Sequence, residues 1–152
     1  MNELRMWAQT EHSVAIFCGL DYSREVSTHF AQEKLLIDQI ELSYKLSLPI
    51  IFNQVAALEQ LIDKILEYQT QIHKCAIYNF TGPLPALDAY LSLTTNVYFI
   101  ITGIIADPSE KGDSLRDIIT KIPIDKLLLA TDSPFNTPQV CFYFILFIIN
   151  CN

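Results

Sequence analysis

The amino-acid sequence predicts an α/β protein built on a parallel sheet. Short apolar runs of strand length alternate with longer segments whose apolar residues recur at helical spacing, in repeats of roughly 25 residues. Apolar residues make up 51% of the 152 residues and charged residues only 18%, which is typical of strands that are covered on both faces. A doubly wound sheet and part of a (β/α)8 barrel both fit this alternation, and periodicity does not separate them.

The first two strand–helix repeats are expected before residue 69. The apolar run at 13–20 (SVAIFCGL) is closed by Gly-Leu-Asp and predicts a buried strand and its loop. Residues 30–46 predict an amphipathic helix, and the short run at 49–52 (PIIF) predicts the second strand. Residues 55–68 then show the cleanest helical pattern of the chain. Its apolar face consists of Leu58, Leu61, Ile62 and Ile65.

The next repeats show the same alternation of strand and helix. Strands are expected at 74–78 (KCAIY) and 97–102 (VYFIIT), the second of which is rich in β-branched and aromatic residues. A turn at 79–82 separates the first of these strands from a short helix around 86–91, where Pro85 suits the first turn.

The last repeat contains a helix and a very short strand. Asp113 or Ser114 is expected to cap the helix, and Pro123 is expected to stop it. The run at 127–129 (LLL) predicts the final strand. In a parallel sheet covered by helices, the carboxyl ends of the strands meet at one edge, and catalytic and binding residues concentrate there.

Asp132 is the candidate metal ligand, because it follows the carboxyl end of the last strand in the stretch Thr-Asp-Ser-Pro. An Asp at the carboxyl end of a barrel strand suits the binding of a divalent metal ion and a water molecule. Spacing alone favours the capping of a turn by this residue, with Ser133 and Pro134 as turn residues. Asp21, after the first strand, is expected to cap its loop. The three histidines share no strand end, so a zinc cluster of histidines is not expected.

The net charge and the cysteine content limit which binding partners and which cellular compartment are expected for this protein. The net charge is −7 and no basic stripe is visible, so binding of nucleic acid through phosphate contacts is expected only if metal ions supply the positive charge. Four cysteines without C-x-x-C spacing and a polar N-terminus predict a cytoplasmic protein with reduced thiols. The apolar run at 140–151 is shorter than the about 20 residues that span a bilayer, so no membrane anchor is expected.

At its strand ends the sequence resembles the TatD family of metal-dependent hydrolases. The matching stretches include CGLDY at 18–22, FTG at 80–82, ITGIIADP at 101–108 and, most specifically, IDKLLLATDSP at 124–134. The resemblance implies a (β/α)8 barrel that acts as a deoxyribonuclease, with Mg²⁺ or a similar divalent ion as cofactor and DNA as substrate. Because such a barrel needs about 250 residues, we expect about five of its eight strand–helix units here. They form a partial barrel over residues 1–139, and residues 140–152 are expected to be an apolar tail unrelated to the family.

Residue by residue, the resemblance implies that most metal ligands are replaced. The bridging Glu of the family falls on Phe17, and two of its His ligands fall on Asn53 and Tyr78. Its opening His-x-His pair has no counterpart, and Ala130 stands where a Glu often precedes Thr-Asp-Ser-Pro. Only Asp132 keeps a ligand type, so it is the expected metal ligand and catalytic residue. Since Asn coordinates weakly and Phe does not coordinate, we expect an impaired or inactive hydrolase. A non-catalytic protein-interaction module and a truncated gene product are the alternatives.

Overall fold

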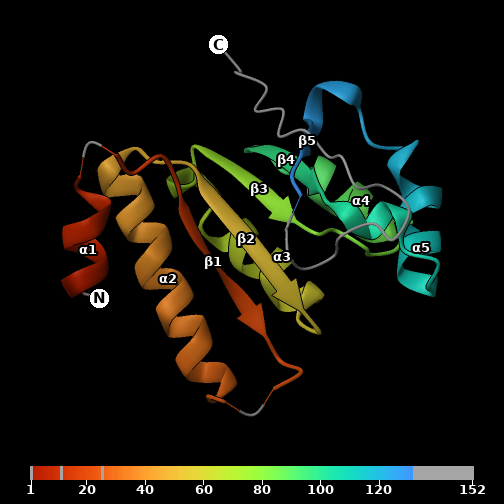
Figure 1. The fold of residues 1–152 in the computed structure, drawn as a ribbon. Helices are drawn as coiled ribbons and strands as arrows, with labels where there is room; N and C mark the ends of the chain where they lie inside the picture. The colour runs from red at the N-terminus through yellow and green to blue at the C-terminus, as the bar shows by residue number, and fades with distance from the viewer. Residues whose placement is uncertain (1, 11, 25, 132–152) are drawn as a thin grey trace.

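The computed structural model describes residues 2–10, 12–24 and 26–131, and over these ranges the chain forms a five-stranded sheet with helices (Figure 1). The strands are β1 (Ile16–Asp21), β2 (Ile50–Val55), β3 (Lys74–Tyr78), β4 (Asn96–Ile101) and β5 (Leu127–Leu129). The α-helices are α1 (Asn2–Ala8), α2 (His29–Leu46), α3 (Leu58–Glu67), α4 (Leu84–Leu91) and α5 (Glu110–Ile119). Short 3-10 turns are η1 (Gln69–Gln71), η2 (Gly103–Ala106) and η3 (Ile124–Lys126).

The order of the strands distinguishes between the two predicted architectures. Every neighbouring pair from β1 to β5 is parallel, and the order along the sheet is the order along the chain. A doubly wound sheet reverses its strand order at a switch point, whereas a barrel adds each new strand on the same side. The described chain shows no reversal. The prediction of an α/β fold that forms about five units of a (β/α)8 barrel is therefore confirmed.

The first strand begins later than predicted, at Ile16 rather than at residue 13. The reason is the short helix α1, which the sequence analysis did not anticipate. The hydroxyl of Ser13 donates a hydrogen bond to the carbonyl oxygen of Trp7 at 2.8 Å, and the hydroxyl of Thr10 donates to the same oxygen at 2.9 Å. Ser13 thus bonds the last turn of α1 and is not part of the sheet.

The prediction that Asp113 or Ser114 caps the last helix is wrong. Helix α5 begins earlier, with Ser109 as its N-cap. The backbone N–H of Ser109 donates to the carboxylate of Asp107 at 2.8 Å, and this tight turn directs the chain into the helix. Asp113 lies inside the helix, where its carboxylate forms an ion pair with Arg116 one turn away.

The two faces of the sheet have different surroundings. Alternate strand residues form one hydrophobic core with helices α2 to α5. The strand members of this core are Ile16, Cys18, Leu20, Ile50, Phe52, Cys75, Ile77, Val97, Phe99 and Ile101. The residues between them point to the opposite face, which we call the inner face because it corresponds to the interior of a barrel. Its two register rows are Phe17–Ile51–Ala76–Tyr98 and Gly19–Asn53–Tyr78–Ile100–Leu128.

Three fully buried aromatic rings fill the core between α4 and the sheet. Phe80 follows β3, Tyr90 lies on α4 and Phe99 lies on β4, and all three have 0% exposure. Each ring meets the other two edge to face, with centroids 5.3 to 6.2 Å apart. This is the favourable arrangement of aromatic quadrupoles, so the cluster anchors the middle of the fold.

The hydroxyl of Tyr90 is buried without a hydrogen-bond partner among the described residues. A buried hydroxyl that lacks a partner loses its hydration without compensation, at a cost of about 1–3 kcal/mol. We expect Tyr90→Phe to raise the free energy of unfolding by about 1 kcal/mol, and the melting temperature by roughly 2–4 °C. Thermal unfolding followed by circular dichroism measures this change. Tyr44→Phe, which removes a hydroxyl from a side chain that is 46% exposed, is the control and is expected to have no effect.

Candidate functional site

Two aromatic rings, one near the start of β1 and one at the end of β3, meet on the inner face. Phe17 of β1 lies edge-on to Tyr78 of β3, with ring centroids 5.3 Å apart and an interplanar angle of 75°. The ring of Phe17 therefore reaches across β2, which lies between the two strands. It is nonetheless 55% exposed, whereas its strand neighbours Ile16 and Cys18 are buried in the helix-facing core.

The fold brings together the three positions at which the resemblance implies lost ligands. Asn53 of β2 is in register with Gly19 of β1 on one side and with Tyr78 of β3 on the other. Phe17 lies two residues before Gly19 on the same face of β1, since strand residues alternate between faces. Phe17, Asn53 and Tyr78 thus share one region of the inner face, on three consecutive strands. The register and the ring contact were not predicted.

A polar contact joins the ends of β3 and β4. The hydroxyl of Thr102, which is buried, donates a 2.5 Å hydrogen bond to Oδ1 of Asn79. Asn79 adopts a left-handed backbone conformation with φ of 52°, and its backbone N–H donates to the carbonyl oxygen of Ile100 at 3.1 Å. The amide oxygen of Asn79 is therefore used to hold two loops together. Sequence reasoning placed Asn79 and Thr102 at strand ends and missed this pairing.

Asp21 caps the loop after β1, as predicted. Its Oδ1 accepts hydrogen bonds from the backbone N–H of Ser23 at 2.9 Å and from the Ser23 hydroxyl at 2.5 Å. These bonds, the hydroxyl bond first, lower the pKa of Asp21, and the nearby Arg24 guanidinium adds to the effect. The side-chain amide of Gln32 on α2 completes the loop by bonding both the N–H and the carbonyl oxygen of Asp21 at 2.8 Å.

The side chains at this edge do not fit a divalent metal ion. Phe17 has no donor atom, Tyr78 offers only a phenol, and Asn53 offers a weakly coordinating amide. In the described ranges, no three His, Cys, Asp or Glu residues lie close enough to hold a metal ion. Asp132, the predicted ligand and catalytic residue, lies outside the described residues, which end at Thr131. Its role stays a prediction.

Cys18 and Cys75 belong to the helix-facing core, and two of the histidines stack on tyrosine rings. Cys18 and Cys75 are free and buried, and burial raises the pKa of both thiols, that of Cys75 to about 12. They are therefore protonated at neutral pH, which makes them poor metal ligands. The rings of His29 and His73 stack on Tyr22 and Tyr44, with centroid distances of 3.6 and 5.3 Å.

Among the helices that the structure describes within residues 2–131, none has both the length and the apolar composition that crossing a bilayer requires. The apolar segment 140–152, for which no membrane anchor was expected, lies outside the described residues.

Comparison with known proteins identifies relatives along nearly the whole chain. The family model of TatD related DNase matches residues 1–141. The chain is 36% identical over 138 residues to the 3'-5' ssDNA/RNA exonuclease TatD of Yersinia pseudotuberculosis, covering 90% of this chain and 52% of that protein. The protein of the same name from Erwinia tasmaniensis is 34% identical over 137 residues, with the same two coverages. The chain therefore spans about half the length of the curated relatives that it matches.

Solved structures share the fold. A TatD homologue from Escherichia coli superposes with a TM-score of 0.76 at 23% identity, over 89% of this chain and 51% of that one. An uncharacterized amidohydrolase from Saccharomyces cerevisiae gives a TM-score of 0.72 at 20% identity, over 91% of this chain and 46% of that one. These likenesses show that the five-stranded sheet corresponds to about half of a larger chain of the same architecture.

Proposed function

Because this chain belongs to the family of TatD-related DNases, we propose that it is a relative of metal-dependent nucleases that lacks metal-dependent hydrolytic activity. One observation carries the proposal: the rings of Phe17 and Tyr78 pack against each other at positions where the resemblance implies a bridging Glu and a His. This contact is aromatic, whereas a metal site at these positions would need charged and imidazole ligands.

Hydrolysis of a phosphodiester by metal ions needs several strong ligands that converge from different strands. In this chain β1 contributes a hydrocarbon ring, β2 an amide and β3 a phenol. The single carboxylate of Asp132 would hold a divalent ion weakly without partners. The net charge of −7 also disfavours the binding of a nucleic acid, because a phosphate backbone approaches an acidic protein only where bound cations supply positive charge.

The relatives are named as exonucleases of single-stranded DNA and RNA, so labelled single strands are the appropriate probe. Purified protein is incubated with single- and double-stranded oligonucleotides and Mg²⁺ or Mn²⁺, with and without EDTA. We expect no chelator-sensitive cleavage by protein whose folding is verified by circular dichroism. Cleavage that EDTA abolishes, and that Asp132→Ala also removes, would overturn the proposal and establish Asp132 as the metal ligand.

A gain-of-binding variant tests the same proposal in the opposite direction. Phe17→Glu, Asn53→His and Tyr78→His together restore ligand types on three consecutive strands. We expect this triple variant to bind Mn²⁺ or Zn²⁺ at least about tenfold more tightly than the unmodified chain, measured by calorimetric titration.

The matched control carries Gln at the same three positions, where a polar amide replaces each side chain without providing a strong ligand. It is expected to bind metal no better than the unmodified chain. Equal binding by the Glu/His and Gln variants would show that the strand ends do not form the site, and would contradict this placement of the lost ligands.

The division of the chain follows the same reasoning. We propose that residues 1–139 form the partial hydrolase barrel and that residues 140–152 are an appended apolar segment. The family model ends at residue 141, which supports this boundary. Residues 140–152 contain no charged side chain, in contrast to the rest of the chain.

A further inference from the structure

The loop between β4 and α5, residues 102–109, is held against α5 by one guanidinium group. Nη1 of Arg116 donates hydrogen bonds to the carbonyl oxygens of Ile105 at 2.6 Å and of Asp107 at 3.0 Å. Nη2 of the same side chain bonds the carboxylate of Asp113, which also lies on α5. The planar fork of arginine thus makes three contacts at once, and two of them reach the backbone of the loop.

The loop and the helix also lie unusually close to each other. A Cβ atom on Gly112 of α5 would lie 2.0 Å from the carbonyl oxygen of Asp107 and 2.9 Å from that of Ile104. The lack of a side chain at Gly112 therefore lets the loop backbone lie against the helix, where Arg116 reaches its carbonyl oxygens.

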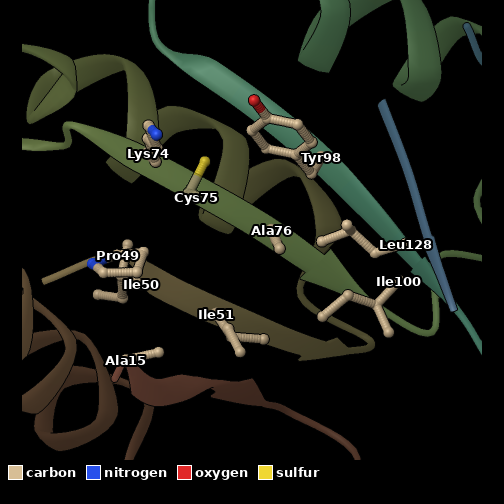
Figure 2. A pocket seen from close by; sticks show the side chains of 10 residues that line it. All are labelled: Ala15, Pro49, Ile50, Ile51, Lys74, Cys75, Ala76, Tyr98, Ile100 and Leu128. Atoms are coloured by element: carbon tan, nitrogen blue, oxygen red, sulfur yellow. The ribbon is translucent and has the colours of Figure 1, made fainter. Parts of the chain in front are cut away.

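Strand β4 gives this loop a fixed starting point. It is paired with β3 on one side and with β5 on the other. Its side chains Tyr98 and Ile100 line an apolar hollow on the inner face, together with Leu128 of β5 (Figure 2). A central strand of a sheet opens only with the sheet as a whole, so a local motion of the loop has to begin after β4, at Thr102.

The loop forms a small unit with hydrogen bonds of its own. In the turn η2, the backbone N–H of Ile105 donates to the carbonyl oxygen of Thr102 at 3.2 Å. The N–H of Asp107 donates to the carbonyl oxygen of Ile104 at 2.9 Å. The side chains of Ile104 and Ile105 are only partly buried against the core. The polar contacts from α5 therefore contribute a large part of the attachment of this unit.

We propose that Arg116 is a latch, whose release lets residues 103–108 open away from α5 as one unit while the sheet stays folded. Thr102, at the start of the loop, bonds Asn79 after β3, so the loop adjoins the carboxyl edge of the sheet. Arg116 is thus a positioning residue for this edge. The inference rests on the contacts of the loop and does not depend on whether the strand ends bind metal.

Hydrogen–deuterium exchange of the full chain, measured by mass spectrometry, tests the latch. Arg116→Met removes the guanidinium and keeps an unbranched apolar stem. We expect amide exchange in residues 103–108 to become at least about tenfold faster, while exchange in β2 stays unchanged. Lys121→Met is the matched control, because it removes an exposed positive charge that lies beyond the end of α5. It is expected to leave exchange in the loop unchanged.

Two further variants separate the contacts of the latch. Gly112→Ala leaves Arg116 in place but forces the carbonyl group of Asp107 away from α5, so the same local acceleration is expected. This variant also provides the test if Arg116→Met folds poorly. Arg116→Lys keeps the charge but not the fork, and its loop is expected to exchange faster than that of the unmodified chain.

Three outcomes would overturn the proposal. The first is unchanged exchange of residues 103–108 in folded Arg116→Met and Gly112→Ala. The second is equal acceleration in the loop and in β2, because Arg116 would then stabilise the whole sheet rather than the loop. The third is full protection of the loop in Arg116→Lys, which would assign the effect to the positive charge and not to the guanidinium fork.

Discussion

Gly19→Ala is expected to lower the free energy of unfolding by more than about 3 kcal/mol. Gly19 lies within β1, where it pairs with Asn53 of β2. A Cβ atom at this position would lie 1.7 Å from the carbonyl oxygen of Asn53 and 2.7 Å from its carbonyl carbon. Both atoms belong to the backbone of the neighbouring strand, so no side-chain rotation relieves the overlap. The two strands must separate, and β1 is held to the sheet by this pairing.

Urea denaturation followed by circular dichroism measures this loss. Gly82→Ala is the matched control, because it also adds one methyl group to a glycine. Its Cβ would lie 2.8 Å from the ring of Phe80, a milder overlap than the 1.7 Å to backbone at Gly19, so a smaller loss is expected. If Gly19→Ala were no more destabilising than Gly82→Ala, the close approach of β1 and β2 would not be the stability determinant described here.

Phe80→Ala is expected to destabilise the protein by about 3–5 kcal/mol. Phe80 is fully buried and contacts Tyr90 of α4 and Phe99 of β4, with centroid distances of 5.8 and 5.3 Å. Its removal leaves a cavity between helix and sheet and also breaks two edge-to-face contacts, each worth about 0.5–1.5 kcal/mol. Chemical denaturation measures the change in unfolding free energy.

Phe30→Ala provides the comparison for Phe80→Ala. Phe30 lies near the start of α2 and is 78% exposed, so the same truncation there is expected to change stability by less than about 0.5 kcal/mol. Similar losses for the two variants would contradict the central packing role of Phe80. Phe80, the first residue of the Phe-Thr-Gly stretch that contributes to the family resemblance, thus packs in the core.

The strands were predictable where an apolar run is bounded by polar residues. The predicted and observed bounds coincide for β3 and β5, because Lys74 and Tyr78 delimit one run and three leucines form the other. Ser13 misled the prediction of β1, since its hydroxyl is used to end a seven-residue helix that has no clear periodicity. The start of α5 was missed because a turn at Asp107, and not an apolar pattern, determines it.

The candidate site was predictable in its location but not in its contacts. Placing Asn53, Tyr78 and Thr102 at the carboxyl ends of strands needs only the strand bounds and the parallel topology. The contact between Phe17 and Tyr78 depends on the register of three strands, which residues distant in sequence determine together. The hydrogen bond from Thr102 to Asn79 likewise depends on the left-handed backbone at Asn79, which periodicity does not reveal.

The sequential strand order has a consequence for how the protein is made. From β1 to β5, each strand pairs with the strands just before and just after it in the chain. A ribosome releases the N-terminal strands first, so each new strand meets its pairing partner already synthesised. Pairing then requires closure of loops of only one strand–helix repeat, which keeps the entropic cost of each step low. Translation and assembly of this sheet can therefore proceed in the same direction, one repeat at a time.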